Sequence, residues 1–279
     1  AFHEAGHAVM AELCGRLLTE VEIVDISRDE DEAAVRELGS AAAFHMETTV
    51  RSGDIIGVSS WSATLLGMVD AMHPVSGVKD VRVIQILGGG GDPAAEGHAT
   101  HLVRRLTDLL HGEGTFLPAP SSVGSAEARD VLVQDPYVAR AMNLWNDLDV
   151  AYIGIGGQET SGLLASSGNV FSPDELRTVR EAGAVGDIGL RYLRADGSPV
   201  DTPLDDRVIG IELEQLKRAP RSIAVAGGPA KTEAIHAALV GGWINCLITD
   251  TYTAERLLEM GSARDKTTLE EEPMGAGVG

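Results

Sequence analysis

Short apolar runs alternate with helix-patterned segments along most of this 279-residue chain. Val21–Ile26, Ile55–Ser59, Val81–Leu87 and Val150–Ile155 have the length and composition of buried strands, and segments such as Asp31–Thr49 between them show helical periodicity. Consecutive strands joined by helices pair in parallel, and a parallel sheet needs helices over both faces. The sequence therefore predicts an α/β fold, a Rossmann-like, mostly parallel sheet with helices on both faces.

The chain shows no internal repeat and no interdomain linker, which favours a single domain over residues 1–261. Within it, Gly183–Arg207 is interpreted as an antiparallel hairpin that leaves the main sheet, and Val208–Ile211 as a further strand. A helix is expected over Tyr252–Gly261. Residues 262–279 are acidic and then glycine-rich, and we expect a disordered tail.

The charge balance excludes a DNA-binding surface on this chain alone. Its 42 acidic residues outnumber 22 basic ones, giving a formal net charge of -20, and no cluster of Lys and Arg is present to displace counterions. No apolar run is long enough to cross a bilayer and no secretory signal is visible, so we expect a cytoplasmic protein. Cys14 and Cys246 each lie in an apolar stretch, which favours buried thiols over a disulfide.

The segment from His3 to His7 matches HExxH, in which two histidines one helical turn apart ligate zinc and the glutamate activates water. The motif lies next to the chain end, and the β/α alternation that follows does not resemble a metalloprotease. We therefore expect coincidence and no bound metal, and keep a zinc metalloprotease as a remote alternative.

Two loops at predicted strand ends have the composition of anion sites. Ser60-Trp-Ser-Ala-Thr64 precedes a helix, so its hydroxyls and the free N–H groups of the first turn could hold a phosphate, although Ser and Thr are also ordinary helix caps. Gly227 and Gly228 let the backbone approach a ligand, and Lys231 follows at a helix start.

Two further loops add a glycine run and a carboxylate. Gly88 and Gly89 belong to a run of four glycines that either forms a flexible loop or lets a ligand lie on the main chain. Asp187 follows a glycine-bounded turn and suits the hydroxyls of a sugar. In open α/β sheets ligands bind beyond the carboxyl ends of the strands, where all four loops are expected.

Seven segments in order carry a resemblance over roughly Ala8 to Gly261. They are Ser60-Trp-Ser-Ala-Thr64, Val83-Ile-Gln-Ile-Leu-Gly-Gly89, Leu117-Pro-Ala-Pro120, Asp149-Val-Ala-Tyr-Ile-Gly-Ile-Gly156, Gly183-Ala-Val-Gly-Asp187, Ala226-Gly-Gly-Pro-Ala-Lys231, and Leu247-Ile-Thr-Asp250 with Thr253-Ala254. Together they resemble the effector-binding domain of SorC-family bacterial transcriptional regulators. The resemblance implies a fold similar to sugar-phosphate isomerases and deaminases, and a phosphorylated sugar as ligand.

By that resemblance the phosphate would lie on Ser60, Ser62, Ala63 and Thr64, and the remaining ligand-binding residues would be Gly88, Gly89, His98, Asp187 and Lys231. The sequence departs from the family at Ser62 and Ala63, in the middle of the first loop. It also departs at Leu87, which is an arginine in some members. A differently substituted or unphosphorylated polyol is therefore an open alternative.

These features favour a non-catalytic sensor without a cofactor, an effector domain that forms a homo-oligomer. The family also carries an N-terminal helix-turn-helix, which this sequence lacks, so DNA contact is expected only through that absent domain. The alternative is a sugar-phosphate isomerase or deaminase, with Asp187 as base and Lys231 as electrophile.

Overall fold

The computed structural model describes residues 18–26, 31–90, 93–159, 162–166, 168 and 171–270. Its centre is a seven-stranded sheet in which every neighbouring pair runs parallel. In spatial order the strands are β1 (Glu20–Val24), β9 (Cys246–Asp250), β8 (Arg221–Val225), β5 (Val150–Ile153), β2 (Ile55–Val58), β3 (Arg82–Gln85) and β4 (Glu113–Thr115). The predicted Rossmann-like fold class is confirmed.

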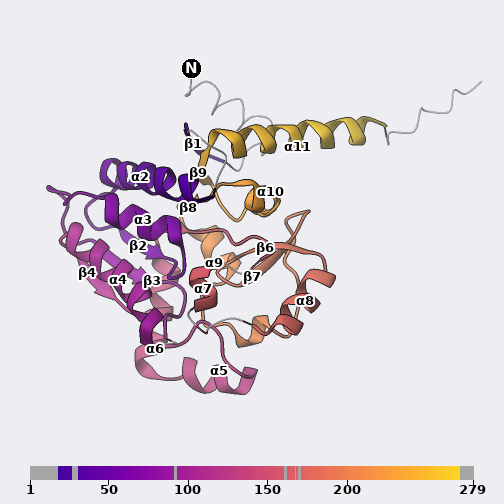
Figure 1. The fold of residues 1–279 in the computed structure, drawn as a ribbon. Coiled ribbons are helices and arrows are strands. Elements are labelled where there is room, and N and C mark those ends of the chain that lie inside the picture. Colours follow the sequence, from indigo (N-terminus) through magenta and orange to yellow (C-terminus); the bar gives the residue numbers. More distant parts are fainter. Residues whose placement is uncertain are drawn as a thin grey trace, which may run out of the picture.

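Helices cover both faces of this sheet (Figure 1). Successive side chains of β5 point to opposite faces, so Val150 and Tyr152 join one apolar cluster while Ala151 and Ile153 join the other. The first cluster lies under α2 (Asp31–Thr49), α3 (Ala63–Ala71) and α4 (Pro93–Leu109). The second lies under α6 (Pro136–Asn143), α9 (Leu213–Arg218), α10 (Thr232–Val240) and the start of α11 (Thr251–Glu270).

A small lobe stands apart from the sheet and contains the predicted hairpin, now confirmed, of β6 (Ala184–Ile188) and β7 (Arg191–Arg194). The turn residues Gly189 and Leu190 have φ values of 58° and 67°, the combination of positive values that a tight hairpin turn of primed type requires. The lobe includes α7 (Gly162–Ser166) and α8 (Pro173–Glu181), and its apolar side chains form a third cluster together with Trp61 and Leu87. The remaining helix, α5 (Ala126–Val133), precedes α6.

The structure differs from the sequence-based prediction at two elements. Val208–Ile211 is not a strand, because Val208 and Gly210 make only isolated bridges to Ser122 and Leu87. Helix α11 continues to Glu270, beyond the predicted end at Gly261, so this part of the expected tail is helical. Residues 271–279, the HExxH segment and Cys14 lie outside the described residues.

Candidate functional site

A cleft of about 680 Å³ opens beyond the carboxyl ends of β2, β5 and β8, where the fold class places ligands. The starts of α3 and α10 form one part of its wall, and the loop after β5 and the β6–β7 hairpin form the rest. Its volume lies within the range of about 300–1,000 Å³ that is usual for small-molecule pockets.

The first turn of α3 presents polar groups to this cleft. Ser62 caps the helix, since its Oγ accepts a 3.3 Å hydrogen bond from the N–H of Leu65. The hydroxyls of Ser62 and Thr64 lie 2.9 Å apart, and Thr64 donates to the carbonyl of Val225 at the end of β8. The N–H groups of Ala63 and Thr64 have no acceptor within the helix, so they and the helix dipole favour an anion here.

The loop between β8 and α10 forms the facing wall. Gly228 has a φ of 95°, and its N–H donates to the carboxylate of Asp250 at 3.0 Å and to the hydroxyl of Thr253 at 2.8 Å. A Cβ on Gly227 would collide with the Asp250 carboxylate, so glycine is required there. Buried Asp250 and Thr253 thus hold the loop in place, and Lys231 at the start of α10 lies at the cleft.

Asp187 of β6 supplies a carboxylate. Its backbone exchanges two hydrogen bonds with Gly156, of 2.9 and 3.1 Å, and its Oδ2 accepts a 2.8 Å bond from the N–H of Leu190. Burial raises the pKa of Asp187, while the Leu190 bond and the positive charge of Lys231 act in the opposite direction. An acceptor for ligand hydroxyls therefore lies near a cation in the same cleft.

Three glycines after β5 line the cleft and were missed by the site prediction. A Cβ on Gly154 would lie 2.6 Å from Ser62 Oγ, one on Gly156 would collide with the Asp187 carboxylate, and one on Gly157 would lie 2.7 Å from the carbonyl of Ala230. Their close spacing directly after a buried strand was the available signal. These glycines let the walls of the cleft approach one another.

The structure brings together Ser62, Ala63, Thr64, Asp187 and Lys231, five of the predicted site residues, on the wall of one cleft. Trp61 also lines it and donates from its indole nitrogen to the carbonyl of Gly88 at 2.9 Å.

Ser60, Gly88 and Gly89 do not line the cleft. Each packs against other residues behind the cleft wall. Ser60 is fully buried and donates a 2.6 Å hydrogen bond to the carbonyl of Leu87. A Cβ on Gly88 would collide with the carbonyl of Pro120, and one on Gly89 with the side chain of Gln85. Gly88 and Gly89 are thus packed against protein and do not form a ligand platform in this cleft.

His98 is exposed on α4 and is also absent from the lining of the cleft. Leu87 does line it, apolar as the sequence indicated. The groups of this cleft that can bind an anion therefore lie at the starts of α3 and α10.

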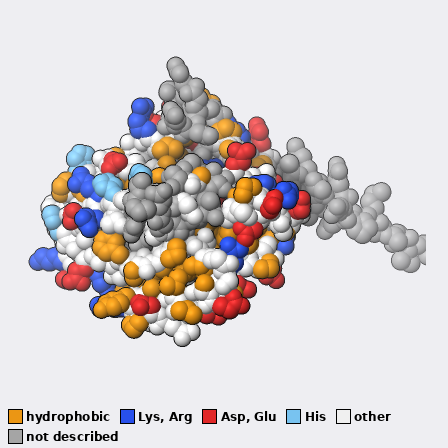
Figure 2. All heavy atoms as spheres, turned by 60° about the horizontal axis from the view of Figure 1, so that its bottom comes forward, with side chains coloured by type: hydrophobic (Ala, Val, Ile, Leu, Met, Phe, Trp, Pro, Cys, Tyr) orange, Lys and Arg blue, Asp and Glu red, His pale blue; other side chains and the backbone are white. Residues whose placement is uncertain are grey.

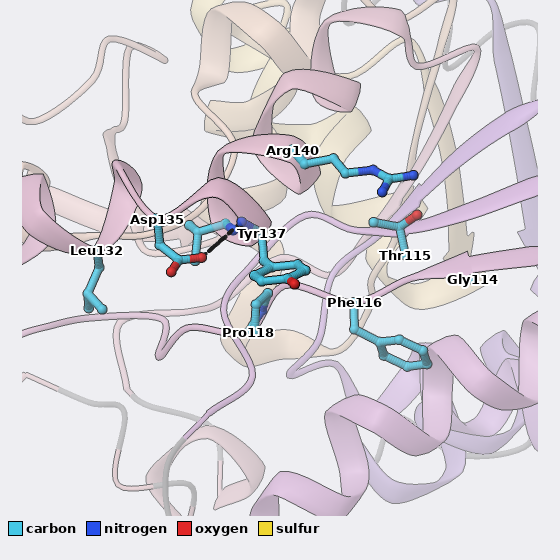
Figure 3. Close-up of a pocket in the computed structure, with 9 residues that line it drawn as sticks. Gly114, Thr115, Phe116, Pro118, Leu132, Asp135, Tyr137 and Arg140 are labelled. Carbon is cyan, nitrogen blue, oxygen red and sulfur yellow. Dashed lines mark hydrogen bonds between the residues drawn. The ribbon is translucent and has the colours of Figure 1, made fainter.

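A second hollow lies between the end of β4 and α6 and is lined by Phe116, Pro118, Tyr137 and Arg140 (Figure 3). The Tyr137 side chain is 75% exposed, so this is an open surface depression. Figure 2 shows hydrophobic side chains gathered on the side of the molecule where α5 and α6 lie. Residues of α5 and α6 contribute exposed apolar area, which is a property of contact surfaces.

Comparison with known proteins assigns the family. Residues 17–259 match the model of the family described as "Putative sugar-binding domain". The chain is 30% identical over 241 residues to the deoxyribonucleoside regulator of Bacillus subtilis, an alignment covering 86% of this chain and 76% of that protein. It is 32% identical to the transcriptional regulator LsrR of Klebsiella pneumoniae, covering 81% and 68% of the two chains.

The fold has the same assignment. The crystal structure of the full-length sorbitol operon regulator SorC from Klebsiella pneumoniae superposes with a TM-score of 0.82 at 26% identity, covering 91% of this chain and 80% of that one. The architecture and the cleft define an α/β ligand-binding domain of the kind found in transcriptional regulators. The chain belongs to the sugar-binding domain family of SorC-type regulators.

Among the described helices, none has the combination of length and apolar character that crossing a bilayer requires.

Proposed function

We propose that this chain is the effector-sensing domain of a bacterial transcriptional regulator and binds a phosphorylated sugar in the cleft beyond β2, β5 and β8. The observation that carries this proposal is the convergence of two helix starts, those of α3 and α10, with Lys231 and Asp187 on one cleft. The curated relatives named above are regulators, which supports a sensing role.

The two ends of the ligand meet different chemistry in this proposal. The phosphate lies against the N–H groups of Ala63 and Thr64, with Lys231 supplying positive charge. The sugar hydroxyls donate to Asp187, whose carboxylate would repel a phosphate placed next to it. Trp61 provides an apolar wall beside the sugar ring. This polarity of the cleft favours a ligand with an anionic end and a hydroxylated end.

A thermal-shift screen over phosphorylated sugars and their unphosphorylated counterparts tests the proposal. A ligand at 100 times its Kd stabilises the folded state by about 2.7 kcal/mol, which moves the midpoint measurably. We expect a phosphorylated hit whose shift is lost in Lys231→Ala and kept in Lys79→Ala, which removes the same charge from an exposed lysine. A hit that ignores phosphate and tolerates Lys231→Ala would contradict it.

The domain is non-catalytic in this proposal. An isomerase or deaminase is the second candidate, because Lys231 is close enough to Asp187 to influence its pKa, as a proton-transfer pair would be. Incubating the protein with the hit from the screen separates the two functions. Stabilisation without turnover supports the sensor, and product formation supports the enzyme.

Ligand occupancy would set the DNA affinity of the regulator in the cytoplasm, with DNA contact through a part outside residues 18–259. The net charge of -20 opposes direct DNA binding by this chain. A ligand changes that affinity only to the extent that it binds one state of the regulator more tightly than the other.

We also propose that the regulator self-associates through the face around Phe116, Val131 and Tyr137. These side chains are 39, 71 and 75% exposed, and β4 next to them is an edge of the described sheet. A second copy would cover both the apolar area and the strand edge. Sedimentation velocity should show a smaller species for Tyr137→Glu than for wild type, and unchanged sedimentation would refute this surface.

A further inference from the structure

Three side chains of metal-ligating type meet at the rim of the sheet opposite the cleft. Glu20 and Cys246 are the first residues of β1 and β9 and are paired in register, and His45 lies in α2 above them. One ligand atom from each lies within 4.8 Å of the others. Because all strands run parallel, their amino ends lie at the rim away from the cleft, so this cluster is separate from the sugar site.

One ring nitrogen of His45 is held by a neighbouring side chain. Its Nδ1 lies 2.7 Å from the hydroxyl of Tyr152, and the carbonyl of His45 accepts a 2.7 Å bond from the hydroxyl of Thr49. In the tautomer whose Nδ1 donates to Tyr152, the lone pair lies on Nε2, the nitrogen that would meet a metal ion.

That lone pair is buried without a hydrogen bond. His45 is 5% exposed, and its Nε2 has no hydrogen-bond partner. The nearest carboxylate oxygen, Glu20 Oε2, is 3.6 Å away, too far for a normal hydrogen bond. Burial lowers the pKa of His45, against the opposing charge of Glu20, and so favours the neutral imidazole. A neutral imidazole fixed through its other nitrogen is the form in which histidine binds metal ions.

The separations are close to those of ligands around a tetrahedral ion, and the longer one would need to contract by a few tenths of an ångström on binding. Bonds of about 2.0–2.3 Å to zinc place neighbouring tetrahedral ligand atoms about 3.3–3.8 Å apart. The separations are 3.6 Å from His45 Nε2 to Glu20 Oε2 and 4.0 Å from Cys246 Sγ to the same oxygen. We propose that Glu20, His45 and Cys246 form a zinc site, with water as the fourth ligand. The Glu20 side chain is 57% exposed, which gives the ion a path from solvent.

With zinc bound, the charges of the ion and its protein ligands sum to zero. Burial raises the pKa of the Cys246 thiol, so it is protonated before zinc binds. Zinc displaces that proton to solvent, and one thiolate with one carboxylate neutralises the two positive charges of the ion. Arg221, the nearby cation, is already paired with Asp54 at 2.8 Å. A neutral site is compatible with the buried surroundings of His45 and Cys246. The bound ion would cross-link the edge strand β1 to β9 and to α2.

Cobalt substitution tests the site on the full chain after treatment with chelator. Co²⁺ reports both a thiolate ligand, by a charge-transfer band, and a four-coordinate geometry, by its visible bands. We expect one ion per chain with both signals, and Zn²⁺ should displace it. Cys246→Ser should remove the charge-transfer band, and Glu20→Gln should weaken the affinity at least about tenfold.

Matched controls identify the ligands. Cys14→Ser, Glu113→Gln, which removes an exposed carboxylate from the opposite edge of the sheet, and the double variant His3→Ala/His7→Ala should leave the bands and the affinity unchanged. Because Glu20 is exposed, Glu20→Gln remains informative even if Cys246→Ser does not fold. Weak binding without a thiolate band, or loss of binding in the Cys14 or His3/His7 variants, would overturn the proposal.

Discussion

The hydroxyl of Thr64 donates a 2.9 Å hydrogen bond to the carbonyl of Val225, a residue 161 positions further along the chain. The bond joins the first turn of α3 to the end of β8, and so ties two walls of the cleft together. Thr64 is 3% exposed, so water cannot replace it as a donor.

Replacing Thr64 by valine should therefore destabilise the protein while keeping the shape of the side chain. The buried carbonyl of Val225 would lose its donor, at a cost of about 1–3 kcal/mol. Urea unfolding measures the change, and Thr64→Ser, which keeps the hydroxyl, should lose less. Equal losses for the two variants would show that the hydroxyl does not matter.

Asp250 should be a second position where a polar side chain determines stability. It is fully buried and accepts hydrogen bonds from the N–H of Gly228 and from both the N–H and the hydroxyl of Thr253. Asp250→Ala should lower the free energy of unfolding by about 2–3 kcal/mol, because it leaves buried donors without partners. Thr253→Val removes one hydroxyl and should be milder. Chemical denaturation of both variants gives the comparison, and the opposite ranking would contradict it.

Gly156→Ala should damage ligand binding more than stability. The added methyl group would collide with the carboxylate of Asp187 and turn it away from the cleft. We expect at least a tenfold loss of affinity for the sugar phosphate found by the screen, measured by calorimetry, which is about 1.4 kcal/mol. Gly124→Ala is the control, because a Cβ there meets nothing within 4 Å. Undiminished binding by Gly156→Ala would remove Asp187 from the site.

The ion pair between Glu175 and Arg207 should contribute to the acid sensitivity of the lobe. Hydrogen bonds from Arg207 first, and then from Ser172, lower the pKa of Glu175 from 4.5 to about 2. A depressed pKa means stability that is complete above pH 4.5 and lost as the pH falls toward 2. The stability difference between wild type and Glu175→Gln, from denaturation at several pH values, should shrink over this window. A difference independent of pH would show that the charge of Glu175 is not involved.

Much of the fold could be predicted from local patterns. The range Asp31–Thr49 was predicted with the bounds of α2, because this segment has periodic apolar positions and clear boundaries. Ser172 caps α8 and proline follows in its first turn, a local pattern of the kind that marks a helix start. The prediction of a strand over Val208–Ile211 was wrong, because a short apolar run is also buried as irregular chain when two loops cover it.

The candidate site was harder to predict, because the sequence does not reveal which way a loop faces. Gly88 meets Pro120 and Asp187 meets Gly156, contacts between segments that are distant along the chain. The helix start at Ser62–Thr64 could be inferred, since capping residues mark it locally. The cluster of Glu20, His45 and Cys246 joins three segments that are distant along the chain, and no short motif contains all three residues.

Helix α11 begins directly after β9, and its far end extends away from the sheet (Figure 1). Its first turn contains Thr253, which is bonded to the Gly228 N–H in the cleft wall. With 20 residues it is about 30 Å long at 1.5 Å per residue. A tilt of about 5° at its base therefore displaces its far end by about 2.6 Å. If ligand binding tilts the helix at its base, a displacement too small to disturb the sheet would become a movement of atomic size at Glu270.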